Sequence, residues 1–271
     1  PYSELAWFNL AAAYQGLKLY EKSIDAYQYA VAIDDKFDYA YRNMGDAYLR
    51  LRKYKEAVEV LEKVVALTRP EDVIYEAIGH CYHKLGKIAQ ARFYYKKAVH
   101  LNPDDSKLYY KIATTYMLEK QWQPAIKQLE NAMRMHRAIT EYNLAMGECK
   151  LNLGQFKEAV HYFGVVVKHK PKNVSGWEAL INCLLAAEYY DEALLQSNNA
   201  LVATDHKPIF LFYHSAILFI IGKSKEGLIL LEQAMAASPK LLKKFIDIKP
   251  SVLQNAQVVD LVARFKRRRK I

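Results

Sequence analysis

The chain has 271 residues, of which 52% are hydrophobic and 25% charged, and its formal net charge is +10. This composition argues against intrinsic disorder, and only 10 glycines and 8 prolines argue against a turn-rich β fold. The most apolar stretch, residues 209–221, is shorter than the roughly 20 residues of a membrane-spanning helix. We therefore expect a folded, mostly helical protein.

A repeat of 34 residues organises most of the sequence. Seven segments align without insertion or deletion: 4–37, 38–71, 72–105, 106–139, 140–173, 174–207 and 208–241. The twentieth position of every repeat is small, namely Ser23, Ala57, Ala91, Ala125, Ala159, Ala193 and Gly227. Small residues at fixed places let two helix backbones approach closely. Each repeat is thus predicted to be a pair of antiparallel helices.

Several repeats carry residues typical of the first helix, of the turn after it and of the end of the second helix. Large residues recur at position 11 of the first helix, as Tyr14, Tyr48, Tyr82 and Tyr116. A turn is marked at position 15 by Gly86, Gly154 and Gly222. The second helix is predicted to end at position 32, which holds Pro103, Pro171 and Pro239.

These residues closely resemble the tetratricopeptide repeat pattern W-x2-L-G-x2-Y, then A-x3-F, A and P. Typical matches are Trp7, Leu10, Tyr14, Ala57, Ala98 and Pro103. The resemblance implies an all-α, right-handed solenoid (superhelix) of seven helix-turn-helix repeats, with a concave groove for other proteins. The sequence shows no nucleophile elbow and no phosphate-binding glycine loop, so we expect neither enzymatic activity nor a cofactor.

Both ends depart from the repeat. Residues 1–3 fit the last positions of a preceding repeat, so we expect a fragment of a longer array, or one that has lost its N-terminal cap. We predict an array over 1–241 and capping helices over 242–271, which keep helical periodicity without the repeat pattern. No signal peptide is visible, and we expect a cytoplasmic protein.

Two residue groups could suggest metal or redox chemistry. Cys81, Cys149 and Cys183 all occupy position 10, where other repeats hold small residues, so we interpret them as buried packing residues with reduced thiols. Glu76, His80 and His83 are spaced to share one helix face, as zinc ligands often are. Because no second partner for these ligands is evident, we predict no metal site.

Function is expected in the groove, which in the family is lined by positions 2, 5, 9, 12 and 13 of each first helix. The candidate partner-binding residues are Arg42, Asp46, Arg50, Glu76, His80, His83, Tyr110, Met117, Leu144, Leu151, Leu185, Phe212, Phe219 and Ile220. They change from charged to apolar along the chain. A large apolar strip is seldom left bare, so we expect a scaffold or adaptor that binds an amphipathic helix or extended segment there. The alternatives are that the capping segment or a second copy of the chain covers the strip.

A basic tail supports another hypothesis. Six basic residues lie in the last eight positions: Arg264, Lys266, Arg267, Arg268, Arg269 and Lys270. Such a cluster could bind the phosphates of a nucleic acid or an anionic membrane surface. The alternative function is therefore an accessory factor that acts through its tail.

Overall fold

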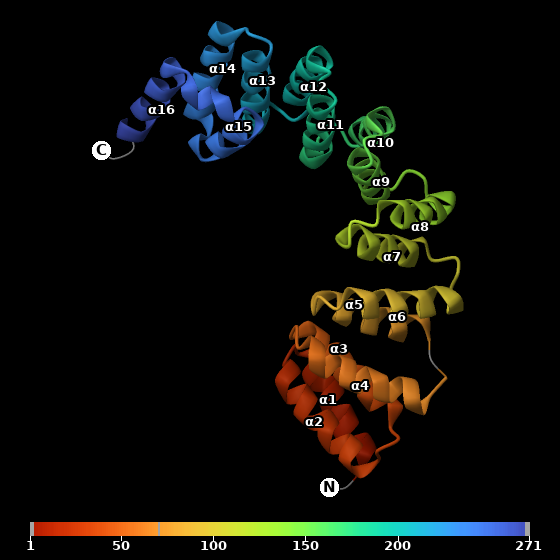
Figure 1. Cartoon of the computed structure of the whole chain (residues 1–271). Coiled ribbons are helices and arrows are strands. Elements are labelled where there is room, and N and C mark those ends of the chain that lie inside the picture. The colour runs from red at the N-terminus through yellow and green to blue at the C-terminus, as the bar shows by residue number, and fades with distance from the viewer. Residues whose placement is uncertain (1–2, 70, 269–271) are drawn as a thin grey trace. The chain divides into compact units, whose positions relative to one another are not determined.

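The computed structural model describes residues 3–69 and 71–268, with side chains up to residue 265. All regular elements within these ranges are helices, and they follow one another in pairs (Figure 1). The pairs are α1 (Glu4–Gly16) and α2 (Tyr20–Ile33), α3 (Asp38–Arg50) and α4 (Tyr54–Leu67), α5 (Asp72–Lys84) and α6 (Ile88–Leu101), α7 (Ser106–Leu118) and α8 (Trp122–Met135), α9 (Thr140–Asn152) and α10 (Phe156–His169), α11 (Val174–Ala186) and α12 (Tyr190–Ala203), and α13 (Pro208–Ile220) and α14 (Ser224–Ala237). The predicted all-α solenoid class is confirmed.

The chain divides into two compact halves, Pro1–Arg137 and Ala138–Ile271, and each is described by itself. The N-terminal half holds α1 to α8, and the C-terminal half holds α9 to α14 and the segment that follows them. No helix within the described part of the chain has both the length and the apolar content needed to cross a membrane.

The turn inside each repeat depends on one residue in the left-handed region. Position 15 has a positive φ in all seven repeats, at Lys18, Arg52, Gly86, Lys120, Gly154, Glu188 and Gly222. The amide of the next residue donates back across the turn, as from Gln155 to the Lys150 carbonyl at 2.9 Å, and this is the bond that ends many helices. The glycine signal therefore located three of the seven turns, because longer side chains adopt the same backbone conformation in the other four.

Close approach of the paired helices explains the small residues at fixed positions. Gly147 on α9 is buried against Phe163 on α10, and a Cβ added at Gly147 would lie 2.4 Å from the Phe163 ring. Real Cβ atoms do not approach other atoms so closely, so the ring and the glycine depend on each other. The same arrangement recurs at Gly79, which faces the Tyr95 ring.

Gly147→Ala is expected to lower the free energy of unfolding by about 1–3 kcal/mol, because the new methyl group overpacks the α9–α10 contact. Urea denaturation followed by circular dichroism measures this change. Gly164→Ala on α10 is the matched control, since nothing lies within 4 Å of a Cβ placed there. The control should be neutral or slightly stabilising, as alanine favours a helix interior over glycine. Equal effects of the two changes would contradict the packing argument.

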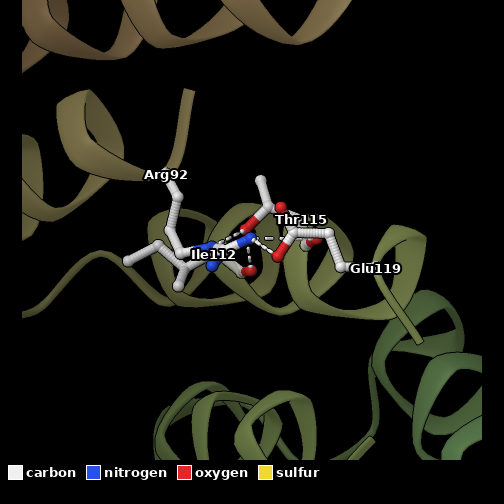
Figure 2. Close-up of polar contacts among 4 residues, drawn as sticks. All are labelled: Arg92, Ile112, Thr115 and Glu119. Atoms are coloured by element: carbon white, nitrogen blue, oxygen red, sulfur yellow. Dashed lines mark hydrogen bonds and ion pairs between the residues drawn. The ribbon is translucent and has the colours of Figure 1, made fainter. Parts of the chain in front are cut away.

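Repeats 3 and 4 are joined by a polar contact centred on Arg92 of α6 (Figure 2). Its Nε donates to Thr115 Oγ1 at 2.9 Å, and its guanidinium pairs with the Glu119 carboxylate. The guanidinium carbon also lies 4.0 Å from the centre of the Tyr116 ring. Only 14% of the Arg92 side chain is exposed. Thus one nearly buried arginine fixes α6 against the C-terminal end of α7.

The capping segment packs on repeat 7 and shares its core. Repeat 7 ends in the 3-10 helix η1 (Pro239–Leu241), and the capping segment then forms α15 (Leu242–Ile248), the 3-10 helix η2 (Pro250–Gln254) and α16 (Ala256–Arg268). Phe245 of α15 is fully buried in one cluster with Phe212 of α13 and with Val258 and Leu261 of α16. Because this core is continuous with repeat 7, residues 242–268 belong to the C-terminal half rather than to a separate domain.

Candidate functional site

The residues at positions 2, 5, 9, 12 and 13 of the first helices form what we call the first-helix face. In the N-terminal half this face mixes charged groups, several of them paired, with exposed apolar side chains such as Leu5, Val73 and Leu118. Gln15 donates to Asp46 at 2.8 Å, and Arg42 pairs with Glu71 at 2.7 Å. Asp46 lies 3.5 Å from the exposed guanidinium of Arg50. Arg42, Asp46 and Arg50 therefore all have partners within or next to α3.

The predicted trio of Glu76, His80 and His83 lies on this face of α5, and all three side chains are partly buried. Glu76 pairs with Lys111 of α7. Burial lowers the pKa of both histidines, and the charges of Lys84 and Lys111 lower them further. No group of three or more metal-ligating side chains in position to hold a metal occurs among the described residues. The trio is thus part of an ion-paired surface, and Tyr110 and Met117 lie half-buried on the next first helix.

The three cysteines are free and buried, as their repeat position predicted. Burial raises the pKa of Cys81 and of Cys149 to about 12, and that of Cys183 to about 11. Their thiols therefore stay protonated at neutral pH and behave as small apolar groups.

In the C-terminal half the first-helix face holds more apolar residues, and it is partly covered. Leu144, Leu151 and Leu185 are half-buried and pack at the edge of the core. Phe212 is fully buried, and Phe219 packs edge-on to Phe245 with ring centres 5.7 Å apart. The prediction that Phe212 lies open to a partner is wrong, because this side chain is fully buried in the cluster that α13 shares with α15 and α16, whereas Phe219 is half-buried at the edge of that cluster.

The alternative of a covering cap is therefore correct at the end of the array. Ile220, next to Phe219, is half-buried at the last residue of α13. The capping segment packs on α13, so the candidate binding surface is limited to the part of the first-helix face on α9 and α11.

A pocket of about 370 Å³ opens where α15 meets this face. It is lined by Asn182, Leu185 and Ala186 of α11, Tyr213 of α13, and Lys244, Asp247 and Ile248 of α15. Its polar wall is held in place by Glu178, which accepts hydrogen bonds from Lys244 Nζ at 2.8 Å and from the Tyr213 hydroxyl at 3.3 Å. Burial raises the Tyr213 pKa, so this hydroxyl remains a donor. The result is a pocket of mixed character, in which the polar side chains of Asn182, Lys244 and Asp247 lie beside the apolar side chains of Leu185, Ala186 and Ile248.

Sequence reasoning missed the α15 contribution to this pocket. Lys244, Asp247 and Ile248 lie in a segment that was expected only to cap the array. The alternation of apolar and charged residues in Leu242–Ile248 was a usable signal, since an amphipathic helix has one face to bury and another to offer.

A half-buried histidine, His214, lies on α13. Ser197 donates to the Leu194 carbonyl at 2.7 Å, so the Nδ1–H of His214 donates to Ser197 Oγ, also at 2.7 Å. Burial lowers the His214 pKa, and the carboxylate of Glu226 opposes that shift without reversing it. The C-terminal half therefore folds around a neutral imidazole.

We expect the C-terminal half to lose stability as pH falls below the ordinary histidine value of about 6.5, because the unfolded chain then binds a proton that folded His214 resists. One such group changes the free energy of unfolding by at most about 1.4 kcal/mol per pH unit. Denaturation near neutral pH and near pH ~5 measures the loss. His214→Gln should reduce the pH dependence, whereas exposed His169→Gln should not. An unchanged pH dependence in His214→Gln would contradict the assignment.

The basic tail begins on α16, where Arg264 is exposed. Lys266, Arg267 and Arg268 continue the helix. Arg269 and Lys270 lie outside the described residues. The hypothesis of binding through the tail stays a prediction from sequence.

Comparison with protein families finds three matching models. One is described as the N-terminal TPR repeats region of Psidin and matches residues 44–146. Two others, both described as tetratricopeptide repeat, match residues 5–37 and 144–207. A comparison with curated proteins gives no match.

Several solved structures share the fold. The C-terminal part of a TPR repeat-containing protein from Cytophaga hutchinsonii is 18% identical, with a TM-score of 0.76 over 89% of this chain and 99% of that one. A tetratricopeptide repeat protein from Parabacteroides merdae is 12% identical, with a TM-score of 0.65 over 92% of this chain and 99% of that one. YrrB, a TPR protein with an unusual peptide-binding site, is 19% identical, with a TM-score of 0.59 over 64% of this chain and 89% of that one. At these identities the likeness shows the fold alone.

Proposed function

Because the chain belongs to the tetratricopeptide repeat family, we propose that it is a non-catalytic interaction scaffold whose C-terminal half binds a segment of a partner protein on the first-helix face. The pocket between α11, α13 and α15 carries this proposal. It places the apolar side chains of Leu185, Ala186 and Ile248 beside polar groups that Glu178 holds in position, and recognition sites commonly combine the two. The peptide-binding site of YrrB, a protein with a similar fold, supports the same kind of function.

The chemistry of the face indicates what the segment carries. Leu144, Leu151 and Leu185 offer half-buried apolar contacts that a leucine or aromatic side chain would complete. Exposed Glu141 and Glu148 on α9 add negative charge. The preferred partner is therefore an amphipathic helix or extended strand with apolar anchors and basic residues beside them.

Photo-crosslinking tests the location of the partner. A photoreactive phenylalanine derivative replaces Asn182, an exposed residue at the pocket, and in a second variant replaces Val202. Val202 is 66% exposed on α12, the second helix of the same repeat, and does not line the pocket. A crosslinked partner from the native lysate is expected with the Asn182 derivative only. Equal yield at the two positions would sink the proposal.

Ala186→Arg supplies the matching loss of function. Ala186 is exposed at the last residue of α11, so a long side chain there fills the pocket without touching the core. Crosslinking from position 182 should fall at least about tenfold, the effect of losing one well-packed anchor. A crosslinked product of two copies of this chain would indicate self-association instead of a separate partner.

A further inference from the structure

A second cavity, of about 400 Å³, lies in the N-terminal half and away from the first-helix face. It is lined by Tyr75 of α5 and by Phe93, Lys96, Lys97, His100 and Leu101 of α6. Five of these six residues belong to α6, which is the second helix of its repeat. This cavity is therefore distinct from the site proposed above.

The repeats themselves provide a reference for what is unusual here. Phe93 stands at position 22, which is charged or polar in four other repeats: Asp25, Glu59, Lys127 and His161. In repeat 3 the same solvent-facing position holds an aromatic ring that is 54% exposed, and Leu101 beside it is 46% exposed. Packing within the solenoid does not require Phe93, because repeats 1 and 2 have the same helix pair with a carboxylate there. An aromatic group at this position is thus available for another molecule.

The charge around the cavity has one sign. Lys97 Nζ lies 5.2 Å from the Tyr75 ring centre, 4.6 Å from that of Phe93 and 5.6 Å from that of Tyr94, so three rings hold its ammonium group in place. Lys96 and His100 are exposed on the same rim. No carboxylate lines the cavity, and within the described part of the chain none of these three basic groups forms an ion pair.

The Glu62 carboxylate, which lies against the aromatic group, is already occupied by hydrogen bonds. Glu62 accepts a hydrogen bond from the Tyr94 hydroxyl at 2.9 Å and another from the Tyr82 hydroxyl at 3.2 Å. It therefore holds the rings in position and leaves the positive charge of Lys97 for an external anion.

We propose that this cavity binds an acidic segment of a partner protein, with an apolar or aromatic side chain placed against Phe93 and Leu101 and carboxylates beside Lys96 and Lys97. Complementary charge and an exposed aromatic anchor together specify such a ligand. The site would let the chain hold a second protein while the first-helix face holds another, and it does not depend on the function proposed above.

The test selects peptides from a random displayed library on the full chain, with counter-selection on Phe93→Glu. Glutamate occupies the same position of repeat 2 as Glu59, so the fold accepts it. The counter-selection removes peptides that bind the first-helix face, because the Phe93→Glu variant retains that face and captures them. The surviving peptides are expected to combine aspartate or glutamate with leucine or an aromatic residue.

Fluorescence anisotropy of a surviving peptide then measures affinity. Phe93→Glu and Lys97→Asn should each weaken binding at least about tenfold, and added salt should weaken it further. Asparagine is the natural residue at the matching place in repeat 4, Asn131. Ile229→Glu is the control for Phe93→Glu. Ile229 occupies position 22 of repeat 7, as Phe93 does in repeat 3, and is 60% exposed, so its replacement should leave the affinity for the peptide unchanged.

Three results would overturn the proposal. The first is that no peptide survives, or that survivors lack carboxylates. The second is an oligonucleotide that binds the chain through Phe93 and Lys97 where acidic peptides do not, which would assign the cavity to nucleic acid. The third is a dimer in analytical ultracentrifugation that Phe93→Glu dissociates, which would assign it to a second copy of the chain.

Discussion

Phe212→Asp is expected to unfold repeat 7 together with the capping segment, at a loss of at least about 3–5 kcal/mol. The Phe212 side chain is fully buried in the cluster that joins α13, α15 and α16. Replacement removes a large apolar group and places a carboxylate among the buried apolar side chains of that cluster. Hydrogen exchange resolved by segment is the appropriate measurement, because parts of a repeat array can unfold separately.

Ile229→Asp is the control for this experiment. Ile229 lies on α14, in the same helix pair, but is 60% exposed. Its replacement should change stability by no more than about 0.5 kcal/mol. Native protection of α13, α15 and α16 in Phe212→Asp would mean that the segment does not cover Phe212 in solution and would return this residue to the candidate binding surface.

Arg92→Met should destabilise the contact between repeats 3 and 4 by about 2–3 kcal/mol. The substitution keeps the aliphatic part of the side chain but removes the hydrogen bond to Thr115, the ion pair with Glu119 and the contact with the Tyr116 ring. Hydrogen bonds to a charged group contribute about 1.5–3 kcal/mol, and a cation over an aromatic ring about 0.5–1 kcal/mol. The sum is below simple addition because Glu119 regains water when its partner is lost.

Two further variants identify the source of the Arg92 effect. Arg92→Lys keeps the charge but not the planar fork that reaches Thr115 and Glu119 together, so an intermediate loss is expected. Lys127→Met removes an exposed charge from α8 and should have almost no effect. Urea denaturation of the full chain, followed in its N-terminal half, measures the stability of Arg92→Met, Arg92→Lys and Lys127→Met. If Arg92→Lys is as stable as the wild type, charge alone accounts for the contact.

The repeat period predicted the fold well because the residues that recur with it are those that pack the paired helices together. Position 20 is small wherever the second helix crosses the first, and Gly147 against Phe163 shows how little space remains between such helices. These constraints are local and recur in every repeat, so one chain supplies several independent observations of each. The positive φ of Lys18 and Glu188 was not predicted, because their side chains, unlike glycine, are not typical of the left-handed region.

The candidate site was harder to predict because it depends on contacts distant in sequence. Phe212 and Leu185 occupy equally plausible positions of the first-helix face, yet α15 buries the first and leaves the second half-exposed. The bond from Lys244 to Glu178 links residues 66 positions apart. A periodic pattern contains no information about such a contact, because the capping segment lies outside the period.

The contacts between successive repeats limit how freely this array can be recombined. Gln15 with Asp46, Glu76 with Lys111 and Arg92 with Glu119 each take one partner from each of two adjacent repeats. A repeat that is duplicated, deleted or exchanged would carry half of such a pair to a neighbour without the other half. Gene rearrangements that preserve the period of 34 residues can therefore still produce an unstable protein, and repeats 1 and 2, like repeats 3 and 4, are inherited most safely together.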